Sequence, residues 1–283
     1  MSIEREDLGS GTTSKEMTTK QNDSRFTVDP LPEPEKLSGC DWLMKQSHLD
    51  LLIVFLAECI GTGLLVFIGC LGAVENDHYK PSHLSVALGF GLAVMLIINI
   101  FGMVTGAHLN PVVTLGAFIY KLVSVPTAIS YCLGQMLGGY LGYGLLRILL
   151  PISDNGFCVS QPTIDTAKAF GLEFMITSIL MMVYCGVVDP RNANHHDSVP
   201  LRFGLTVTCM ALVAGPFSGG SMNPARSFGP ALYSGVWKHQ WLYWAAPFSA
   251  SLITVTAFRM IFYKAPLDQR NPETLPLNDK DDV

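Results

Sequence analysis

Charged residues are scarce in this chain and unevenly placed along it. Of its 283 residues, 14% are Asp, Glu, Lys or Arg, 49% are hydrophobic, and the mean hydropathy is positive. The charges concentrate in residues 1–47 and 264–283, and few lie in residues 48–263. This composition is typical of a membrane protein and argues against a soluble domain. The net charge of −5 argues against nucleic acid as a partner.

Catalytic and metal-binding patterns are also missing. The apolar part of the sequence contains no nucleophile with an acid–base pair and no cluster of metal ligands, and His195 and His196 stand in a polar connector. We therefore expect no enzyme, no metal site and no cofactor. The cysteines fall mainly inside apolar segments, and we interpret them as small buried hydrophobic residues rather than a disulfide framework. They are Cys40, Cys59, Cys70, Cys132, Cys158, Cys185 and Cys209.

Six apolar segments are candidates to cross a bilayer. A hydrocarbon core of about 30 Å requires about 20 helical residues, and the fifth segment is the shortest and least defined. The first twenty residues lack the apolar core of a signal peptide, so the first span is expected to act as its own insertion signal. The predicted spans are Leu51–Val74, Leu84–Val104, Val125–Leu150, Ala167–Val188, Leu201–Ala214 and Trp241–Tyr263.

Two shorter apolar segments, Asn110–Lys121 and Asn223–Tyr233, each begin with Asn-Pro. Asn is a preferred helix N-cap and Pro is favoured at the first helical position, so both motifs predict helix starts. About ten helical residues cover about 15 Å, half the hydrocarbon thickness. Each segment should therefore re-enter from one face, and the two should meet near the centre. Interrupted segments at matching places in two halves predict a permeation site at the membrane midplane.

The two halves are predicted to be repeats, at about residues 48–150 and 167–263. Glu58 precedes Asn110 by 52 residues, and Glu173 precedes Asn223 by 50. Because each half contains an odd number of spans, the second is inserted upside down, which makes an inverted repeat. The predicted fold is an all-α membrane protein with six transmembrane helices and two re-entrant half-helices.

Basic residues predict the orientation of the chain. With both termini in the cytosol, thirteen Lys and Arg residues fall on the inner side and four on the outer side. Residues 1–47 are then a cytosolic tail, expected to be disordered, and residues 264–283 are a second cytosolic tail. The expected location is the plasma membrane.

Three stretches carry a resemblance to a known family: Ala57–Thr62, Gly106–Pro111 and Met222–Pro230. On these stretches, residues 48–263 resemble the aquaporin, or major intrinsic protein, family. One Asn-Pro-Ala motif is weak support, whereas two related motifs at matching offsets, each preceded by a span with a Glu, are specific. The resemblance implies six tilted helices around one pore per subunit, a homotetramer in the lipid bilayer, and passive conduction without ions or protons.

The two motifs are expected to form the centre of the pore. Each half-helix directs the positive end of its dipole, about half a unit charge, at this centre, and the Asn side chains add N–H donors. A water that turns its oxygen toward both donors interrupts a hydrogen-bonded wire and raises the barrier to protons. The motif residues are Asn110, Pro111, Val112, Asn223, Pro224 and Ala225. Backbone carbonyls that replace lost hydration are expected at Gly106, Ala107, His108, Gly220, Ser221 and Met222.

Four residues match the family's selectivity filter by their distance from the two Asn residues: Phe90, Ala211, Gly220 and Arg226. A charge at membrane depth is costly, so Arg226 should face a water-filled cavity, or else pair with a buried carboxylate. Ala211 stands where strict water channels have His. Its small side chain leaves a wider filter with one apolar wall, which suits the carbon chain of glycerol.

Other positions follow the water-channel pattern. Ser227 replaces the Asp typical of glycerol facilitators, and Ala231, Tyr243 and Trp244 fit the water channels. A water-channel scaffold with a small filter residue resembles the group called entomoglyceroporins. The expected permeants are water and glycerol or urea. A strict water channel and a non-conducting junctional protein of the same fold are the alternatives.

Several residues have two interpretations. Val112 replaces the family's usual Ala, and we favour packing over narrowing of the pore. His108 is expected to be a neutral pore-lining donor rather than a gate. Glu58 and Glu173 are expected to accept hydrogen bonds from the backbone of the re-entrant loops, rather than only to pack at helix crossings.

Glycines four residues apart are expected to permit close helix packing: Gly134, Gly138 and Gly142.

Overall fold

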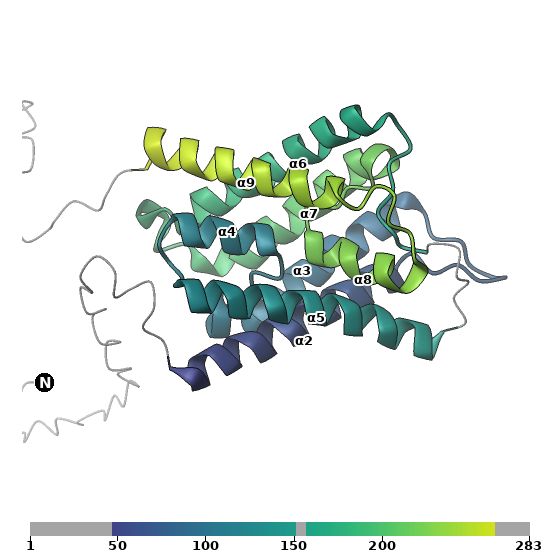
Figure 1. Cartoon of the computed structure of the whole chain (residues 1–283), viewed down its shortest axis with the longest axis horizontal. Helices are drawn as coiled ribbons and strands as arrows, with labels where there is room; N and C mark the ends of the chain where they lie inside the picture. Colours follow the sequence, from purple (N-terminus) through teal and green to yellow (C-terminus); the bar gives the residue numbers. More distant parts are fainter. Residues whose placement is uncertain (1–46, 151–156, 264–283) are drawn as a thin grey trace, which may run out of the picture. The chain divides into compact units, whose positions relative to one another are not determined.

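The structure is a computed structural model that describes residues 47–150 and 157–263 (Figure 1). Within these ranges the chain is helical, with one isolated β-bridge between Asn76 and Tyr79. The two predicted tails lie outside the described residues, except for Ser47. The helices are α2 (His48–Leu71), α3 (His83–Thr105), α4 (Pro111–Ile119), α5 (Val125–Leu149), α6 (Thr166–Val188), α7 (Val199–Ser218), α8 (Pro224–Ser234) and α9 (Leu242–Ile261).

The predicted fold of six long and two short helices is confirmed, with shifts at the ends of helices. The fifth span, α7, is longer than the predicted Leu201–Ala214, because Pro216 is accommodated inside the helix. Five described helices are long and apolar enough to cross a membrane by themselves. Helix α5 has 25 residues but is not among them, since its sequence includes Gln135, Arg147 and several glycines.

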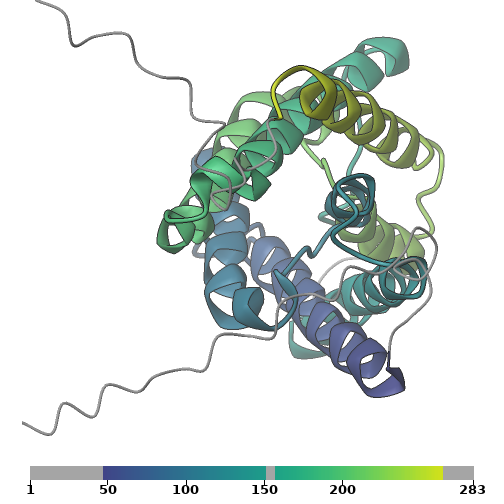
Figure 2. The same ribbon diagram turned by 90° about the vertical axis from the view of Figure 1, so that its left-hand side faces the viewer.

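The two halves of the chain pair in equivalent ways. The first and third long helices of each half pack together, as α2 with α5 and as α6 with α9, and the second long helices, α3 and α7, pack against each other. Both short helices, α4 and α8, contact the long helices α5 and α9. Figure 2 shows the bundle from one end, where the long helices are arranged in a ring. Each short helix is therefore held by long helices of both halves.

Glycines set the distance between α2 and α5. A Cβ on Gly138 would lie 2.2 Å from the carbonyl oxygen of Cys59, and one on Gly142 would lie 2.0 Å from that of Gly63. On the next face, a Cβ on Gly229 of α8 would lie 2.2 Å from the carbonyl oxygen of Gly139. The close packing expected of this glycine series is confirmed.

The outer surface of the long helices is apolar. Large hydrophobic side chains are exposed along α2, α3 and α5, where a soluble bundle would carry polar residues. Lipid or other apolar surfaces fit such a face. Examples are Leu52, Leu56, Leu88, Leu92, Leu96, Leu133, Leu137 and Leu141.

One sequence prediction about the cysteines is wrong. Cys70, in the last turn of α2, forms a disulfide with Cys158 in the connector between α5 and α6. The two Cα atoms are 5.7 Å apart although 88 residues separate them. Only the folded arrangement brings the two residues together, so their spacing in the sequence does not reveal the pair. Among the described cysteines, Cys59, Cys132, Cys185 and Cys209 are free.

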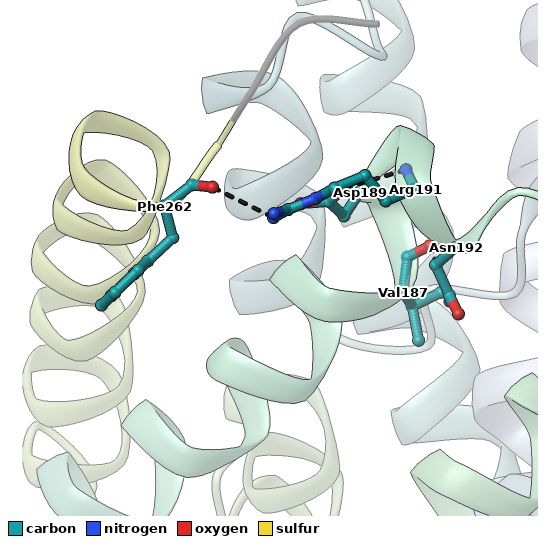
Figure 3. Close-up of polar contacts among 5 residues, drawn as sticks. All are labelled: Val187, Asp189, Arg191, Asn192 and Phe262. Carbon is teal, nitrogen blue, oxygen red and sulfur yellow. Dashed lines mark hydrogen bonds and ion pairs between the residues drawn. The ribbon is translucent and has the colours of Figure 1, made fainter. Parts of the chain in front are cut away.

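A short polar connector joins α6 and α7 at one end of the bundle. Asp189 accepts two hydrogen bonds from the Arg191 guanidinium, from Nε at 2.8 Å and from Nη2 at 2.6 Å. The same Nη2 donates to the carbonyl oxygen of Phe262, the C-cap residue of α9 (Figure 3). This contact joins the connector to the end of the last helix.

Candidate pore and its constriction

A cavity of about 1100 Å³ runs through the bundle. Its lining includes both His83, the first residue of α3, and Met103, near the end of that helix, so it extends along the whole of α3. At one end it is lined by Cys158 and Gln161, and at the other by Val188 and His196. A helix of 23 residues is about 35 Å long, which is enough to connect the two faces of a bilayer.

Two irregular segments of backbone enter this cavity from opposite ends. Both contain residues in the left-handed region: Ala107 and Leu109 have φ of 47° and 56°, and Met222 has φ of 52°. Glycines begin each segment, with φ of 79° at Gly106 and 97° at Gly219. Left-handed backbone is unfavourable for residues with a side chain, so these segments need specific partners to hold them.

Glu58 provides such partners for the first segment. Its carboxylate accepts hydrogen bonds from the backbone N–H groups of His108 and Leu109, at 3.0 and 2.8 Å. It also accepts from Thr105 Oγ1 and from Gln135 Nε2. The side chain is fully buried, and it satisfies the two backbone N–H groups of a segment that has no helical partner for them.

Glu173 plays the same part in the second half. It accepts from the backbone N–H groups of Ser221 and Met222, at 2.9 and 3.0 Å, and from Ser218 Oγ at 2.7 Å. The hydrogen bonds expected of both carboxylates are therefore present, and the packing-only alternative does not apply. Neither carboxylate lines the cavity.

The two Asn side chains lie at the point where the segments meet. Asn110 Oδ1 accepts from Val112 N, and Asn223 Oδ1 accepts from Ala225 N and Arg226 N, so each residue is the N-cap of its short helix. These caps fix the amide orientation and direct each Nδ2 to the opposite segment. Asn110 Nδ2 donates to Met222 O at 2.9 Å, and Asn223 Nδ2 donates to Leu109 O at 2.8 Å.

This reciprocal pair of hydrogen bonds joins the two half-helices at their N-termini. Each amide nitrogen has two hydrogens, and the pair uses one of them. The second hydrogen of each amide is left for a molecule in the cavity, which both Asn residues line. The arrangement therefore presents two N–H donors and two helix N-termini to one point of the cavity.

Arg226 lies in the first turn of α8 and also lines the cavity. Its Nη1 donates to the carbonyl oxygen of Cys158 at 2.9 Å and to Ser160 Oγ at 3.0 Å. Its guanidinium carbon is 4.5 Å from the centre of the Phe90 ring. Within residues 47–150 and 157–263 no carboxylate lies within ion-pair distance of Arg226, so the ion-pair alternative is not met.

Ala211 and Gly220 form another part of the same wall. Both line the cavity together with Phe90 and Arg226. A Cβ on Gly220 would lie 3.3 Å from the Cα atom of Ala211, so the two positions are adjacent. This part of the wall therefore contains one methyl group and one residue without a side chain.

His108 lines the cavity on the other side of the Asn pair. Its ring stacks on Tyr131, with the ring centroids 4.3 Å apart, and Nδ1 lies 3.2 Å from Thr114 Oγ1. Tyr131 in turn donates to Thr105 O. A ring held on one face and at one nitrogen has little freedom to move, which fits a fixed lining group better than a swinging gate.

Not every motif residue reaches the cavity. Gly106, Ala107, Ser221 and Met222 line it, as predicted. Val112 is fully buried in a cluster with Met181 and Val255, and the cavity lining does not include it. This position agrees with packing rather than narrowing of the pore. Pro111, Pro224 and Ala225 also lie behind the lining.

The connector before α6 contributes residues that the sequence prediction missed. Ser160 supplies a hydroxyl to Arg226, and the hydroxyls of Ser160, Ser227 and Ser221 form a chain with distances of 2.6 and 2.5 Å. Ser227 is thus a link between this connector and the second re-entrant segment. The sequence signal was weak, because isolated serines in a polar connector have many other uses.

These features define a class of protein: a membrane channel with two re-entrant half-helices that meet inside a bundle. Comparisons with known proteins identify the family. The profile of the family described as Major intrinsic protein matches residues 45–258. The chain belongs to this family, the aquaporins, whose members are integral membrane channels for water and small solutes.

Relatives and a solved structure agree with this assignment. The chain is 33% identical to Aquaporin-8 of Mus musculus over 213 residues, which is 73% of this chain and 80% of the relative. It is 30% identical to Nodulin-26 of Glycine max over 263 residues, 91% of each chain. The aquaglyceroporin structure from Plasmodium falciparum superimposes with a TM-score of 0.68 at 24% identity, and covers 75% of this chain and 96% of its own. This last similarity concerns the fold.

Proposed function

We propose that this channel conducts water and small neutral solutes such as glycerol and urea, and excludes ions and protons. Phe90, Ala211, Gly220 and Arg226 form its selectivity filter. The observation that carries the proposal is that Ala211 and Gly220, which carry one methyl group between them, line the same cavity as the Arg226 donors, so this wall presents little bulk to a carbon chain. Apolar carbons pass along this wall, while the guanidinium donates to the hydroxyl groups.

Exclusion of ions has two sources in this proposal. The positive charge of Arg226 repels cations at the filter, and the two helix N-termini and the Asn110 and Asn223 donors oppose them at the centre. The donors also orient each water so that a continuous chain of hydrogen bonds is interrupted. Small neutral solutes meet neither barrier.

Both termini are cytosolic in this proposal, and the channel resides in the plasma membrane as a homotetramer. Two observations support the orientation: the excess of Lys and Arg on the inner side, and the disulfide at Cys158. The connector with Cys158 lies at the end of α2, opposite to the start of that helix, and disulfides persist in oxidising compartments outside the cytosol.

The test is swelling of proteoliposomes in separate water, glycerol and urea gradients. Fluxes of water and glycerol well above those of empty liposomes are expected. Water flux without glycerol or urea flux would make the protein a strict water channel, and no flux of any of the three would favour a non-conducting junctional protein.

The filter variant Ala211→His tests the role of this wall. An imidazole at this position adds bulk to the wall beside Gly220 and a polar group that the carbons of glycerol do not use, so glycerol flux should fall far more than water flux. Ala211→Ser keeps the side chain small and is the matched control, with both fluxes near those of the unmodified protein. Equal loss of water and glycerol flux in Ala211→His would contradict the proposed role.

A further inference from the structure

The Cys70–Cys158 disulfide lies directly beside Arg226 of the proposed selectivity filter. Cys158 lines the cavity and is half-buried, whereas Cys70 is fully buried at the end of α2. The carbonyl oxygen of Cys158 is an acceptor for Arg226 Nη1, and its Sγ lies 3.7 Å from Arg226 Nη2. The sulfur bridge and the guanidinium are therefore direct neighbours.

On one side, the disulfide holds the segment that positions Arg226. Cys158 has φ of 58°, a left-handed conformation that a non-glycine residue adopts only under restraint. This conformation brings its carbonyl to the guanidinium, two residues before Ser160 supplies the second acceptor. Release of the side chain would allow the backbone at Cys158 to relax and withdraw the carbonyl.

On the other side, the disulfide ends in the turn of α2 that supports Phe90. A Cβ on Gly69, the residue before Cys70, would lie 2.2 Å from Phe90 Cε1, so the ring packs directly against this turn. Phe90 and Arg226 face each other at 4.5 Å. One covalent bond thus joins the turn of α2 that packs against the Phe90 ring to the connector whose Cys158 carbonyl accepts from Arg226.

We propose that the Cys70–Cys158 disulfide is a positioning element of the selectivity filter, and that its reduction relaxes the size limit of the channel. The disulfide fixes the distance between Phe90 and Arg226 by linking the two elements that hold them. In the reduced protein the guanidinium loses a fixed acceptor, moves within the cavity, and no longer defines a constriction of constant width. This inference rests on the proposed filter.

The chemical step is an ordinary two-electron reduction. A dithiol such as dithiothreitol attacks the Cys158 sulfur from the cavity that this residue lines, the S–S bond breaks, and two protons and two electrons from the reagent give two thiols. The reagent leaves as its own cyclic disulfide. Reoxidation requires a two-electron oxidant, such as a low-molecular-weight disulfide or a peroxide.

The experiment measures the ratio of erythritol to water permeability in proteoliposomes that contain the full chain. Erythritol is larger than glycerol, so the ratio reports the width of the constriction rather than the amount of folded protein. The background is a variant in which the other cysteines are replaced by Ala, so that dithiothreitol acts at one site. The replaced residues are Cys40, Cys59, Cys132, Cys185 and Cys209.

Reduction should raise the erythritol-to-water ratio on the order of tenfold, the scale of one lost hydrogen bond to a charged group. Reoxidation should restore the ratio, and Cys70→Ala with Cys158→Ala should show the raised ratio without reductant and no response to it. An unchanged ratio after complete reduction, verified by alkylation of both thiols, would overturn the proposal. An equal rise in water and erythritol flux would also overturn it.

Should the cysteine variants fail to fold, the reductant acting on the assembled unmodified protein provides the same comparison. Glycerol flux in the oxidised protein tests the proposed function, whereas the erythritol ratio tests the disulfide. A channel that excludes glycerol when oxidised and admits erythritol when reduced would therefore contradict the first claim and support the second.

Discussion

At the scale of single residues, Arg226 combines a fixed position with free donors. Nη1 donates to Cys158 O and Ser160 Oγ, and the ring of Phe90 lies 4.5 Å from the guanidinium carbon. A guanidinium has five N–H groups, so donors beyond these contacts and the one from Nη2 to Cys158 Sγ are available to a permeant oxygen. The charge is thus held in the wall of the cavity without a neutralising carboxylate among the described residues.

The charge of Arg226 should be what keeps ions out of the cavity. Arg226→Val should raise the leak of protons and cations while the fold stays intact, because the repulsive charge is lost from the constriction. The measurement is dissipation of a pH gradient and of a potassium gradient in proteoliposomes. Arg202→Val, which removes a charge from the half-buried first turn of α7, outside the cavity lining, is the control. Unchanged ion exclusion in Arg226→Val would contradict its role as the filter charge.

The site residues that belong to repeated patterns could be predicted from the sequence. The two Asn caps and the carboxylates Glu58 and Glu173 occur at matching offsets, so their partners in the fold followed from the inverted repeat. The acceptors of Arg226 could not be predicted from the repeat. Cys158 and Ser160 belong to a connector without a repeat counterpart, and only the folded chain brings them to a guanidinium more than 60 residues away.

At the scale of elements, the re-entrant segments depend on the buried carboxylates. Left-handed residues such as Leu109 and Met222 keep their backbone N–H groups satisfied through Glu58 and Glu173. A protein interior offers these groups no water as a substitute, so removal of an acceptor leaves them unpaired.

Glu58→Leu and Glu173→Leu should each reduce the yield and thermal stability of assembled protein. Each lost acceptor leaves buried donors unpaired, at about 1–3 kcal/mol for each group. The measurement is the melting temperature in detergent together with the fraction of monodisperse protein. Glu75→Leu removes an exposed carboxylate in the α2–α3 connector and is the control. Normal yield and melting temperature in both buried variants would contradict the anchoring role.

The contact between Asp189 and Arg191, in the connector between α6 and α7, should make the stability of the fold depend on pH. Hydrogen bonds from Arg191 hold the pKa of Asp189 below its ordinary value of 3.8. A carboxylate with a lowered folded-state pKa stabilises the fold above its unfolded pKa, and this contribution is lost as the pH falls through the folded value. Asp189→Asn should therefore lower the melting temperature at neutral pH and have progressively less effect below about pH 4. Asp77→Asn, at an exposed position, should show no such difference, and a pH-independent effect of Asp189→Asn would contradict the explanation.

At the scale of the whole molecule, the two halves interlock through backbone contacts. Helix α5 packs on α2 and on α8 through glycines, so the first half holds the short helix of the second. The general arrangement was predictable from the repeat and from the glycine spacing. Helix ends and the disulfide were not, because they depend on packing between distant segments.

Gly138→Ala should weaken this packing. The new Cβ would lie 2.2 Å from the carbonyl oxygen of Cys59, so α2 and α5 must separate, at about 1–3 kcal/mol for an overpacked site. Gly171→Ala is the matched control, since a Cβ there meets no atom within 4 Å and Ala favours the helix. The melting temperature should fall in the first variant and hold or rise in the second. The reverse order would contradict the packing account.

The most direct test of the central claim is a comparison of three fluxes in the same proteoliposomes. Stopped-flow light scattering measures water and glycerol permeability, and a pH-sensitive dye inside the vesicles measures the proton leak. We expect raised water and glycerol permeability with a proton leak equal to that of empty liposomes. A proton leak that rises together with the water permeability would contradict the pore described above, because two opposed Asn donors and the Arg226 charge should interrupt any proton pathway.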